Sequence, residues 1–220
     1  MRSPMNNEPW SERRIKLLEV PQAELESWPM PLDEALRWVS PHEDKVAGQV
    51  AIFLTQHAYL CCTAHAASDL EHEVGGVLVG QVRRQERDGR LYIVIEDAIQ
   101  ARHTQFGPAH LTFTQDSLVQ LNNELEERFP GKQMVGWYHT HPRMDVFLSS
   151  YDIWLHSNFF GEPWQVALVI EPYAERGGFF CWRPGGQLDP QRYVGFYELA
   201  DISYETVVSW DNLEPVGDDP

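Results

Sequence analysis

The chain has 220 residues, enough for one domain with extensions or at most two small domains. Its 43% hydrophobic content and eight tryptophans can furnish a sizeable core, which excludes a chain that is disordered as a whole. The formal net charge of -16 argues against a nucleic-acid partner, because proteins bind nucleic acids with Lys and Arg that displace counterions.

The beginning of the chain is polar, and no apolar run approaches the length of a membrane span, so no membrane partner is expected. The three cysteines, Cys61, Cys62 and Cys181, are too few and odd in number for a disulfide framework. They fit a reducing compartment, and we expect a cytoplasmic protein. Cys61 and Cys62 are interpreted as core residues, and no Cys and His cluster is expected to form a second, structural zinc site.

The sequence predicts three parts: an N-terminal extension over residues 1–47, a main domain over 48–198 and an acidic tail over 199–220. The extension is rich in proline, and short helices are predicted near residues 11–18 and 32–39. Its tryptophans, which would be costly to leave in water, favour partial docking onto the main domain.

Hydrophobic periodicity and turn residues predict the elements of the main domain. Strands are predicted over residues 50–54, 74–82, 91–95, 134–138, 165–170 and 178–182, and helices over 55–70, from 114 or 116 to about 129, and 150–160. Asp88-Gly89 is a strong signal for a hairpin between the second and third strands. Residues 101–113 have no clean period and are interpreted as a loop or ribbon.

One stretch of the chain, H-x-H-x7-S-x2-D, has the composition of a metal site. Alternate residues of a strand face the same side, about 6.6 Å apart, so His139 and His141 can converge on one ion. Pro142 is expected to end that strand, and Asp152 would arrive from the first turn of the next helix. Two imidazoles and a carboxylate suit one Zn²⁺ per chain, and three protein ligands leave a fourth position open, as in catalytic zinc sites.

Other interpretations of these residues stay open. A single histidine is more often a surface or core residue, and Ser149-x-x-Asp152 also matches a helix-capping box, which is compatible with metal binding. By chance, the whole H-x-H-x7-S-x2-D pattern is expected in about one chain in a thousand. Glu73 is the candidate base, because it precedes a glycine-rich strand that can approach a site closely. His156, one turn after Asp152, could face the site, support it from behind or lie on the helix surface.

Together these residues resemble the JAMM (MPN+, JAB1/MPN/Mov34) zinc metalloprotease family. The resemblance covers roughly residues 48–185 and is closest to stand-alone bacterial members linked to ubiquitin-like conjugation systems. The matching elements are Glu73 with the following GGVLVG, the strand over 135–138, the HTHP motif, Ser149, Asp152 and the strand over 163–170.

The resemblance implies an α/β fold in which helices flank a central mixed sheet in a deaminase-like, three-layer arrangement. It implies zinc held by His139, His141 and Asp152, with Glu73 as proton carrier and Ser149 stabilising the oxyanion. It also implies an isopeptidase that cleaves after the C-terminal glycine of ubiquitin or a ubiquitin-like protein, from lysine conjugates or from a precursor. The implied partners are that modifier, its conjugates and the associated activating and conjugating enzymes.

Residues 101–113 match the region with which family members hold the Gly-Gly tail as an added strand. The short segment between Asp152 and Pro163 lacks the insertion of polyubiquitin-chain cutters, which argues against linkage-specific chain cleavage.

Alternative functions are a non-catalytic scaffold, processing of another peptide substrate, and a small-molecule metal enzyme such as a cupin or an amidohydrolase. A non-catalytic MPN scaffold is disfavoured because no ligand position is lost, whereas processing of a small peptide or a sulfur-carrier precursor would use the same site. A cupin is disfavoured because no histidine follows His156, and an amidohydrolase barrel would need a longer chain.

Overall fold

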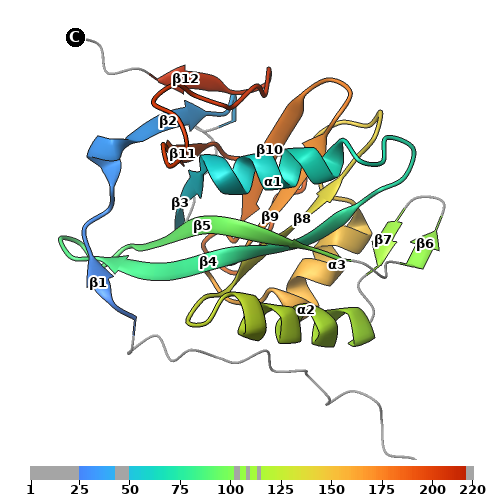
Figure 1. Ribbon diagram of the computed structural model, residues 1–220, viewed down its shortest axis with the longest axis horizontal. Helices are drawn as coiled ribbons and strands as arrows, with labels where there is room; N and C mark the ends of the chain where they lie inside the picture. The colour runs from blue at the N-terminus through green and yellow to red at the C-terminus, as the bar shows by residue number, and fades with distance from the viewer. Residues whose placement is uncertain (1–24, 43–49, 102–104, 108–109, 113–114, 217–220) are drawn as a thin grey trace, which may run out of the picture.

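The computed structural model describes residues 25–42, 50–101, 105–107, 110–112 and 115–216 (Figure 1). Within these residues ten strands form one mixed sheet in the order β10-β9-β8-β4-β5-β3-β11-β2-β12, with β1 paired to β4. The strands of this sheet are β1 (Ser27–Trp28), β2 (Ala35–Val39), β3 (Val50–Thr55), β4 (Gly75–Gln85), β5 (Leu91–Gln100), β8 (Gln133–Thr140), β9 (Val166–Glu171), β10 (Arg176–Cys181), β11 (Phe196–Leu199) and β12 (Glu214–Val216).

Three α-helices and a short ribbon complete the described fold. The helices are α1 (Gln56–Ala66), α2 (Gln115–Arg128) and α3 (Ser150–Phe159), and the ribbon consists of β6 (Gln105–Gly107) paired to β7 (His110–Thr112). In Figure 1, α1 lies on one side of the β4–β5 pair, and α2 and α3 lie on the other. None of the helices in the described ranges is long and apolar enough to cross a membrane.

Two neighbouring residues of β8 show how the layers are built. The Tyr138 hydroxyl lies 2.7 Å from Nδ1 of His65 on α1, whereas Trp137 donates a hydrogen bond to His156 on α3. Successive residues of a strand point to opposite faces, so α1 and α3 cover opposite faces of the sheet. The expected α/β fold with a mixed central sheet is confirmed.

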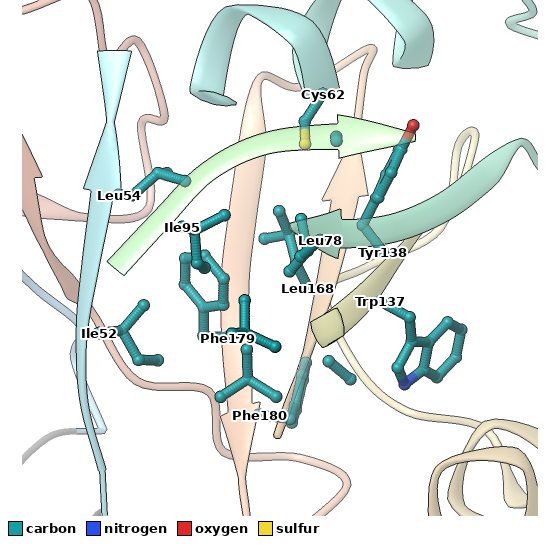
Figure 2. Packing of buried hydrophobic residues seen from close by; sticks show 14 of the residues in the cluster. Ile52, Leu54, Cys62, Leu78, Ile95, Trp137, Tyr138, Leu168, Phe179 and Phe180 are labelled. Atoms are coloured by element: carbon teal, nitrogen blue, oxygen red, sulfur yellow. The ribbon is translucent and has the colours of Figure 1, made fainter. Parts of the chain in front are cut away.

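The core lies on both faces of β8, β9 and β10. Every residue of β9 is buried, as expected for a strand covered on both sides. Figure 2 shows Trp137, Tyr138, Leu168 and Phe180 within this packing. Each fully buried side chain of this kind contributes about 1.5–3 kcal/mol to folding, so the histidine-bearing strand β8 and the adjacent β9 are firmly held.

The prediction of a helix over residues 32–39 is wrong. Residues Leu32–Glu34 form a single 3-10 turn, and Ala35–Val39 form β2, which pairs with β11 and β12. These long-range pairings override the local helical pattern. The predicted hairpin is confirmed: the Gly89 N–H donates to the Gln85 carbonyl, and Gly89 has a positive φ of 72°. The helix predicted over 11–18 lies outside the described residues.

The segment after β11 contributes to the core. Val208, Trp210 and Leu213 are buried, and the ring of Trp210 lies against Gly177, where a Cβ atom would come within 2.4 Å of it. Strands from residues 35–39 and 214–216 belong to the same sheet as the strands of the expected main domain. The boundaries of the main domain after residues 47 and 198 therefore remain predictions.

The buried carboxylate of Glu198 on β11 ties several segments together. It accepts hydrogen bonds from Nε1 of Trp38 at 2.9 Å, Nε2 of Gln56 at 2.9 Å, the Thr206 hydroxyl at 2.6 Å and the Val207 N–H at 3.1 Å. These donors come from β2, α1 and the segment after β11. The carboxylate therefore replaces its lost water contacts with four protein donors.

Replacing Glu198 with Ala should lower the free energy of unfolding by on the order of 3–5 kcal/mol, because four donors, of which Trp38 and Gln56 are buried, lose a charged acceptor. Denaturant unfolding measures the change. Glu214→Ala, at an exposed position of β12, is the control and should change stability by less than about 0.5 kcal/mol. A loss below about 1 kcal/mol for Glu198→Ala would contradict this role.

Candidate metal centre

The position of β8 inside the sheet fixes both histidines. His139 lies opposite Gly75 of β4 on one side and Val169 of β9 on the other. The ladder continues to His141, whose N–H donates to the Ile170 carbonyl at 2.9 Å. The two rings therefore point to the same face of the sheet, and both are almost fully buried.

The capping box of α3 positions the carboxylate. Ser149 is the N-cap: its hydroxyl accepts the Asp152 N–H at 3.2 Å, and Oδ2 of Asp152 accepts the Ser149 N–H at 2.7 Å. A carboxylate is favoured at this position by the helix N-terminus. The cap is therefore compatible with the metal-site interpretation, because it directs the carboxylate toward the histidines.

Three donor groups converge at the end of β8. Nε2 of His139 lies 2.9 Å from Nε2 of His141 and 3.5 Å from Oδ1 of Asp152, and Nε2 of His141 lies 3.9 Å from Oδ2 of the same carboxylate. Nδ1 of His141 lies 3.1 Å from the Asp145 carbonyl oxygen. Since a carbonyl oxygen only accepts, this contact places the proton of His141 on Nδ1 and leaves Nε2 with a lone pair.

The donor set fits a metal ion. The ligand atoms of the three residues all lie within 4.8 Å of one another. Two imidazole nitrogens and a carboxylate at this spacing need a shared proton or a cation between them. Tetrahedral zinc with bonds of about 2.0–2.1 Å would hold two nitrogens about 3.4 Å apart. The two imidazole nitrogens, 2.9 Å apart, would need to separate by only about 0.5 Å to reach that distance.

The protonation states also suit a metal. Burial, with a smaller contribution from the neighbouring His139, lowers the pKa of His141 to about 4. Burial raises the pKa of Asp152, but His139 and Ser149 lower it more, so the net shift is downward. At neutral pH a neutral imidazole and an ionised carboxylate are therefore ready as ligands, with no proton to displace from either.

Aromatic rings pack against both histidines. The Trp137 ring stacks on His139 with centroids 4.7 Å apart and planes within 9°, and Phe147 contacts His141 at the same centroid distance. Nε1 of Trp137 donates to Nδ1 of His156 at 2.9 Å. His156 is fully buried: it supports the site from behind Trp137, and the helix-surface interpretation is wrong. The sequence did not indicate the roles of the two aromatic rings.

The start of β4 brings Glu73 to the same end of β8. The Thr140 N–H donates to the Val74 carbonyl, and the Val74 N–H donates to the Thr140 hydroxyl, both at 2.9 Å. These bonds extend the antiparallel register in which Gly75 faces His139, so that Glu73 stands opposite His141. Opposite residues of such a pair face the same side. The register therefore favours Glu73 on the histidine face, where it is half-buried.

A polar cluster that the sequence did not indicate joins the loops around the site. Arg143, with a positive φ of 61°, donates its N–H to the buried Glu171 carboxylate at 2.9 Å. Its guanidinium donates to the Tyr173 hydroxyl at 2.7 Å and to Glu71 at 3.2 Å. The cluster connects the segment before Glu73 with the loop after His141.

The region 101–113 begins next to the metal centre. The Ala101 N–H donates to the carbonyl of Gly75, the residue opposite His139. The described part of this region forms the β6–β7 ribbon, as predicted, and residues 102–104, 108–109 and 113 lie outside the described residues. Its predicted role in substrate binding stays a prediction.

The buried His156 should make stability depend on pH. Burial lowers its pKa from 6.5 to about 3, so below pH 6.5 the unfolded chain binds a proton that the folded protein excludes. The stability that this group contributes is present above pH 6.5 and is lost as the pH falls toward 3. Between about pH 7 and pH 5 the loss should be about 2 kcal/mol.

Denaturant unfolding at several pH values tests this expectation with His156→Gln, in which the amide oxygen can still accept from Trp137. The variant should lose less stability than the wild type between about pH 7 and pH 5. His72→Gln, whose side chain is exposed in the folded protein, is the control and should follow the wild type. Equal slopes for all three proteins would contradict the expectation.

A protein-family model and a solved structure both match this chain. A family model described as JAB1/Mov34/MPN/PAD-1 ubiquitin protease matches residues 48–160, which are 113 of the 220 residues. A solved structure, protein DSY2949 from Desulfitobacterium hafniense, has a TM-score of 0.50 and 23% identity over 69% of this chain and 94% of that one. It supports the fold.

Two curated relatives match about half of the chain. One is the NAD(+) hydrolase TcpA of Theionarchaea archaeon (strain DG-70-1), 32% identical over 49% of this chain and 30% of its own length. The other is the Lys-63-specific deubiquitinase BRCC36 of Xenopus tropicalis, 27% identical over 47% of this chain and 39% of its own length. The match thus spans only about a third of either relative. Since the family model covers more than half of the sequence, the chain belongs to the JAB1/Mov34/MPN/PAD-1 ubiquitin protease family.

Proposed function

We propose that the protein is a zinc-dependent isopeptidase or peptidase that cleaves after the C-terminal glycine of ubiquitin or a ubiquitin-like protein. The observation that carries the proposal is the convergence of His139, His141 and Asp152 at one end of β8, where the ligand atoms lie within 4.8 Å of one another. The family includes hydrolases such as the deubiquitinase BRCC36, and the chain keeps a complete set of donors.

The chemistry follows from what each group can supply. A zinc ion held by the three ligands would supply Lewis acidity and lower the pKa of water at the site toward about 7. Glu73, on the same face, would accept a proton from the attacking water and deliver it to the departing amine. The Ser149 oxygen accepts the Asp152 N–H, which leaves its own hydrogen to donate to the oxygen of the cleaved carbonyl as negative charge develops.

The cysteines do not suit a thiol mechanism. Burial raises the pKa of Cys62 far above its usual range and that of Cys181 to about 12, and it also raises the pKa of Cys61. A nucleophilic cysteine needs the opposite shift. We therefore propose hydrolysis without a covalent intermediate. The free thiols suit the cytoplasm, where we place the activity.

The β6–β7 ribbon, which follows β5 in the chain, is the proposed substrate-binding region. A Gly-Gly tail in extended form could add to strands there through backbone hydrogen bonds, and the absence of side chains on the tail would permit close approach to the centre. The partners that we propose are a ubiquitin-like protein, its lysine conjugates and the associated activating and conjugating enzymes.

Other functions have less support. A non-catalytic scaffold needs no complete ligand set, whereas processing of a small peptide or a sulfur-carrier precursor would use the same groups. The name of TcpA does not locate its NAD(+) hydrolase activity in the matched part, which is 30% of that protein. The isopeptidase proposal gives a role to each of the three candidate ligands and to Glu73 and Ser149.

Glu73→Gln should retain zinc and lose cleavage. The amide keeps the size of the side chain but cannot accept and return a proton, so kcat should fall on the order of 10²–10⁴-fold. The assay uses ubiquitin, and ubiquitin-like proteins encoded beside the gene, each joined through the C-terminal glycine to the lysine of a fluorescent peptide. Elemental analysis of the same samples gives the zinc content.

Glu71→Gln, two residues earlier in the same segment, is the matched control. It removes a charge from an exposed ion pair with Arg143, and it should keep activity within about fivefold because such pairs contribute little. Wild-type activity in Glu73→Gln would remove Glu73 from the mechanism.

Asp152→Asn should lose metal as well as activity. The amide oxygen is a weaker ligand than a carboxylate, and one altered side chain disturbs both the donor set and the capping box, so zinc affinity should fall on the order of 10–100-fold or more. Equilibrium dialysis against a chromophoric chelator measures the affinity. If the variant bound zinc as tightly as the wild type and stayed active, Asp152 would not be a ligand.

A further inference from the structure

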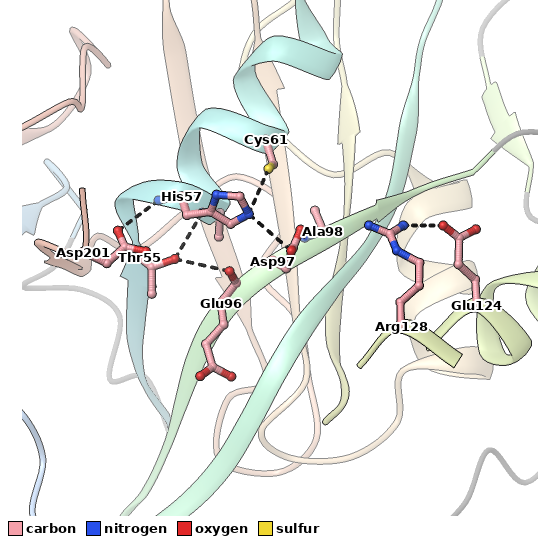
Figure 3. Close-up of polar contacts among 10 residues, drawn as sticks. Thr55, His57, Cys61, Glu96, Asp97, Ala98, Glu124, Arg128 and Asp201 are labelled. Atoms are coloured by element: carbon pink, nitrogen blue, oxygen red, sulfur yellow. Dashed lines mark hydrogen bonds and ion pairs between the residues drawn. The ribbon is translucent and has the colours of Figure 1, made fainter. Parts of the chain in front are cut away.

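A second group of potential metal ligands lies at the beginning of α1. His57 and Cys61 are one helical turn apart, and Asp97 of β5 faces them (Figure 3). Nε2 of His57 lies 3.2 Å from Oδ2 of Asp97 and 3.5 Å from Sγ of Cys61. The ligand atoms of the three residues lie within 4.8 Å of one another, as in the first centre.

The geometry does not suit a catalytic triad. In a Cys-His-Asp relay, the thiol and the carboxylate contact different nitrogens of the imidazole. Here both contact the same atom, Nε2 of His57. Burial and the nearby Asp97 also raise the pKa of Cys61, opposite to the shift that a nucleophile needs. Three donors that converge on one point are instead arranged around a position that a cation can occupy.

We propose that His57, Cys61 and Asp97 form a second metal site for a thiophilic divalent ion of the Zn²⁺ class. Imidazole and thiolate ligands select such ions over Mg²⁺ and Ca²⁺, which prefer oxygen ligands. The His57 side chain is 49% exposed and that of Asp97 20%, so solvent can reach the site and provide a fourth ligand. The site is independent of the proposed peptidase activity.

The position of the site indicates what the ion would do. It would join the first turns of α1 to β5. The same turn is held by Asp201, whose carboxylate accepts the His57 N–H at 3.1 Å. The nearby guanidinium of Arg128 is paired with Glu124 (Figure 3), which reduces the repulsion between this cation and a bound metal. A bound ion would therefore fasten α1 to the sheet.

The second site lies on the other face of the sheet from the first. The helix that carries His57 and Cys61 reaches Tyr138, whereas the first centre lies on the face of Trp137 and α3. Cys61 is partly buried and packs against the core, as interpreted from the sequence. The expectation that no group of Cys and His remains is wrong, because Cys61 also faces His57.

The thiolate distinguishes the two sites. Cobalt(II) replaces zinc in such sites, and a cobalt–thiolate bond gives an intense near-ultraviolet charge-transfer absorption, whereas the His139, His141 and Asp152 set contains no sulfur. Titration of the metal-free, full-length protein with Co²⁺ should produce this absorption. It should be lost in Cys61→Ser and in His57→Asn. It should persist in Asp152→Asn, which disables the first centre, and in Cys62→Ala, the matched control on the same helix.

A second measurement needs no variant. Zn²⁺ should slow alkylation of Cys61 in the wild-type protein on the order of tenfold or more, because a metal-bound thiolate is withdrawn from the reagent. Mass spectrometry identifies the alkylated residue. Absence of the charge-transfer absorption in the wild type, its persistence in Cys61→Ser, or alkylation of Cys61 at an unchanged rate with Zn²⁺ would overturn the proposal. None of these results depends on whether the first centre is catalytic.

Discussion

The candidate metal centre depends on the pairing of β8 with β4 on one side and with β9 on the other. A strand held on both edges cannot slip by one residue without moving every side chain to the opposite face. His139 and His141 therefore stay on one face, and the face is buried beneath α3. The pairing with β4 also brings Glu73 to the same end of β8, so one strand register positions the candidate ligands and the proposed base together.

Burial gives these groups their chemical character. The imidazole of His141 remains neutral to well below neutral pH, and Asp152 remains ionised because its partners outweigh the effect of burial. In a site shielded from water, the same donors interact with a cation more strongly than they would at the surface. The capping box and the stacked Trp137 limit the motion of the ligands, which reduces the reorganisation needed on binding.

The sequence predicted those parts of the site that depend on local spacing. The H-x-H alternation, the Ser149-x-x-Asp152 cap and the hairpin at Asp88-Gly89 each involve residues close together in the chain, so strand and helix periodicity was sufficient. Glu73 was also identified from the sequence, through the glycine-rich strand that follows it, although the antiparallel register that brings it opposite His141 joins distant segments.

The parts that the sequence did not predict depend on contacts between distant segments. β2 forms because β11 and β12 pair with it, and local helical spacing at residues 32–39 carries no information about those partners. His57 and Cys61 have the spacing of ligands on a helix, but the approach of Asp97 from β5 becomes visible only in the fold. The role of His156 likewise depends on the neighbouring strand, which presents Trp137 to it.

We propose that the end of β8 holds a zinc ion, and crystallography of zinc-loaded protein at the zinc absorption edge tests this directly. We predict an anomalous peak about 2.0–2.2 Å from Nε2 of His139, Nε2 of His141 and a carboxylate oxygen of Asp152. If the three side chains were ordered in zinc-loaded crystals and no anomalous peak lay among them, the end of β8 would not be a zinc site.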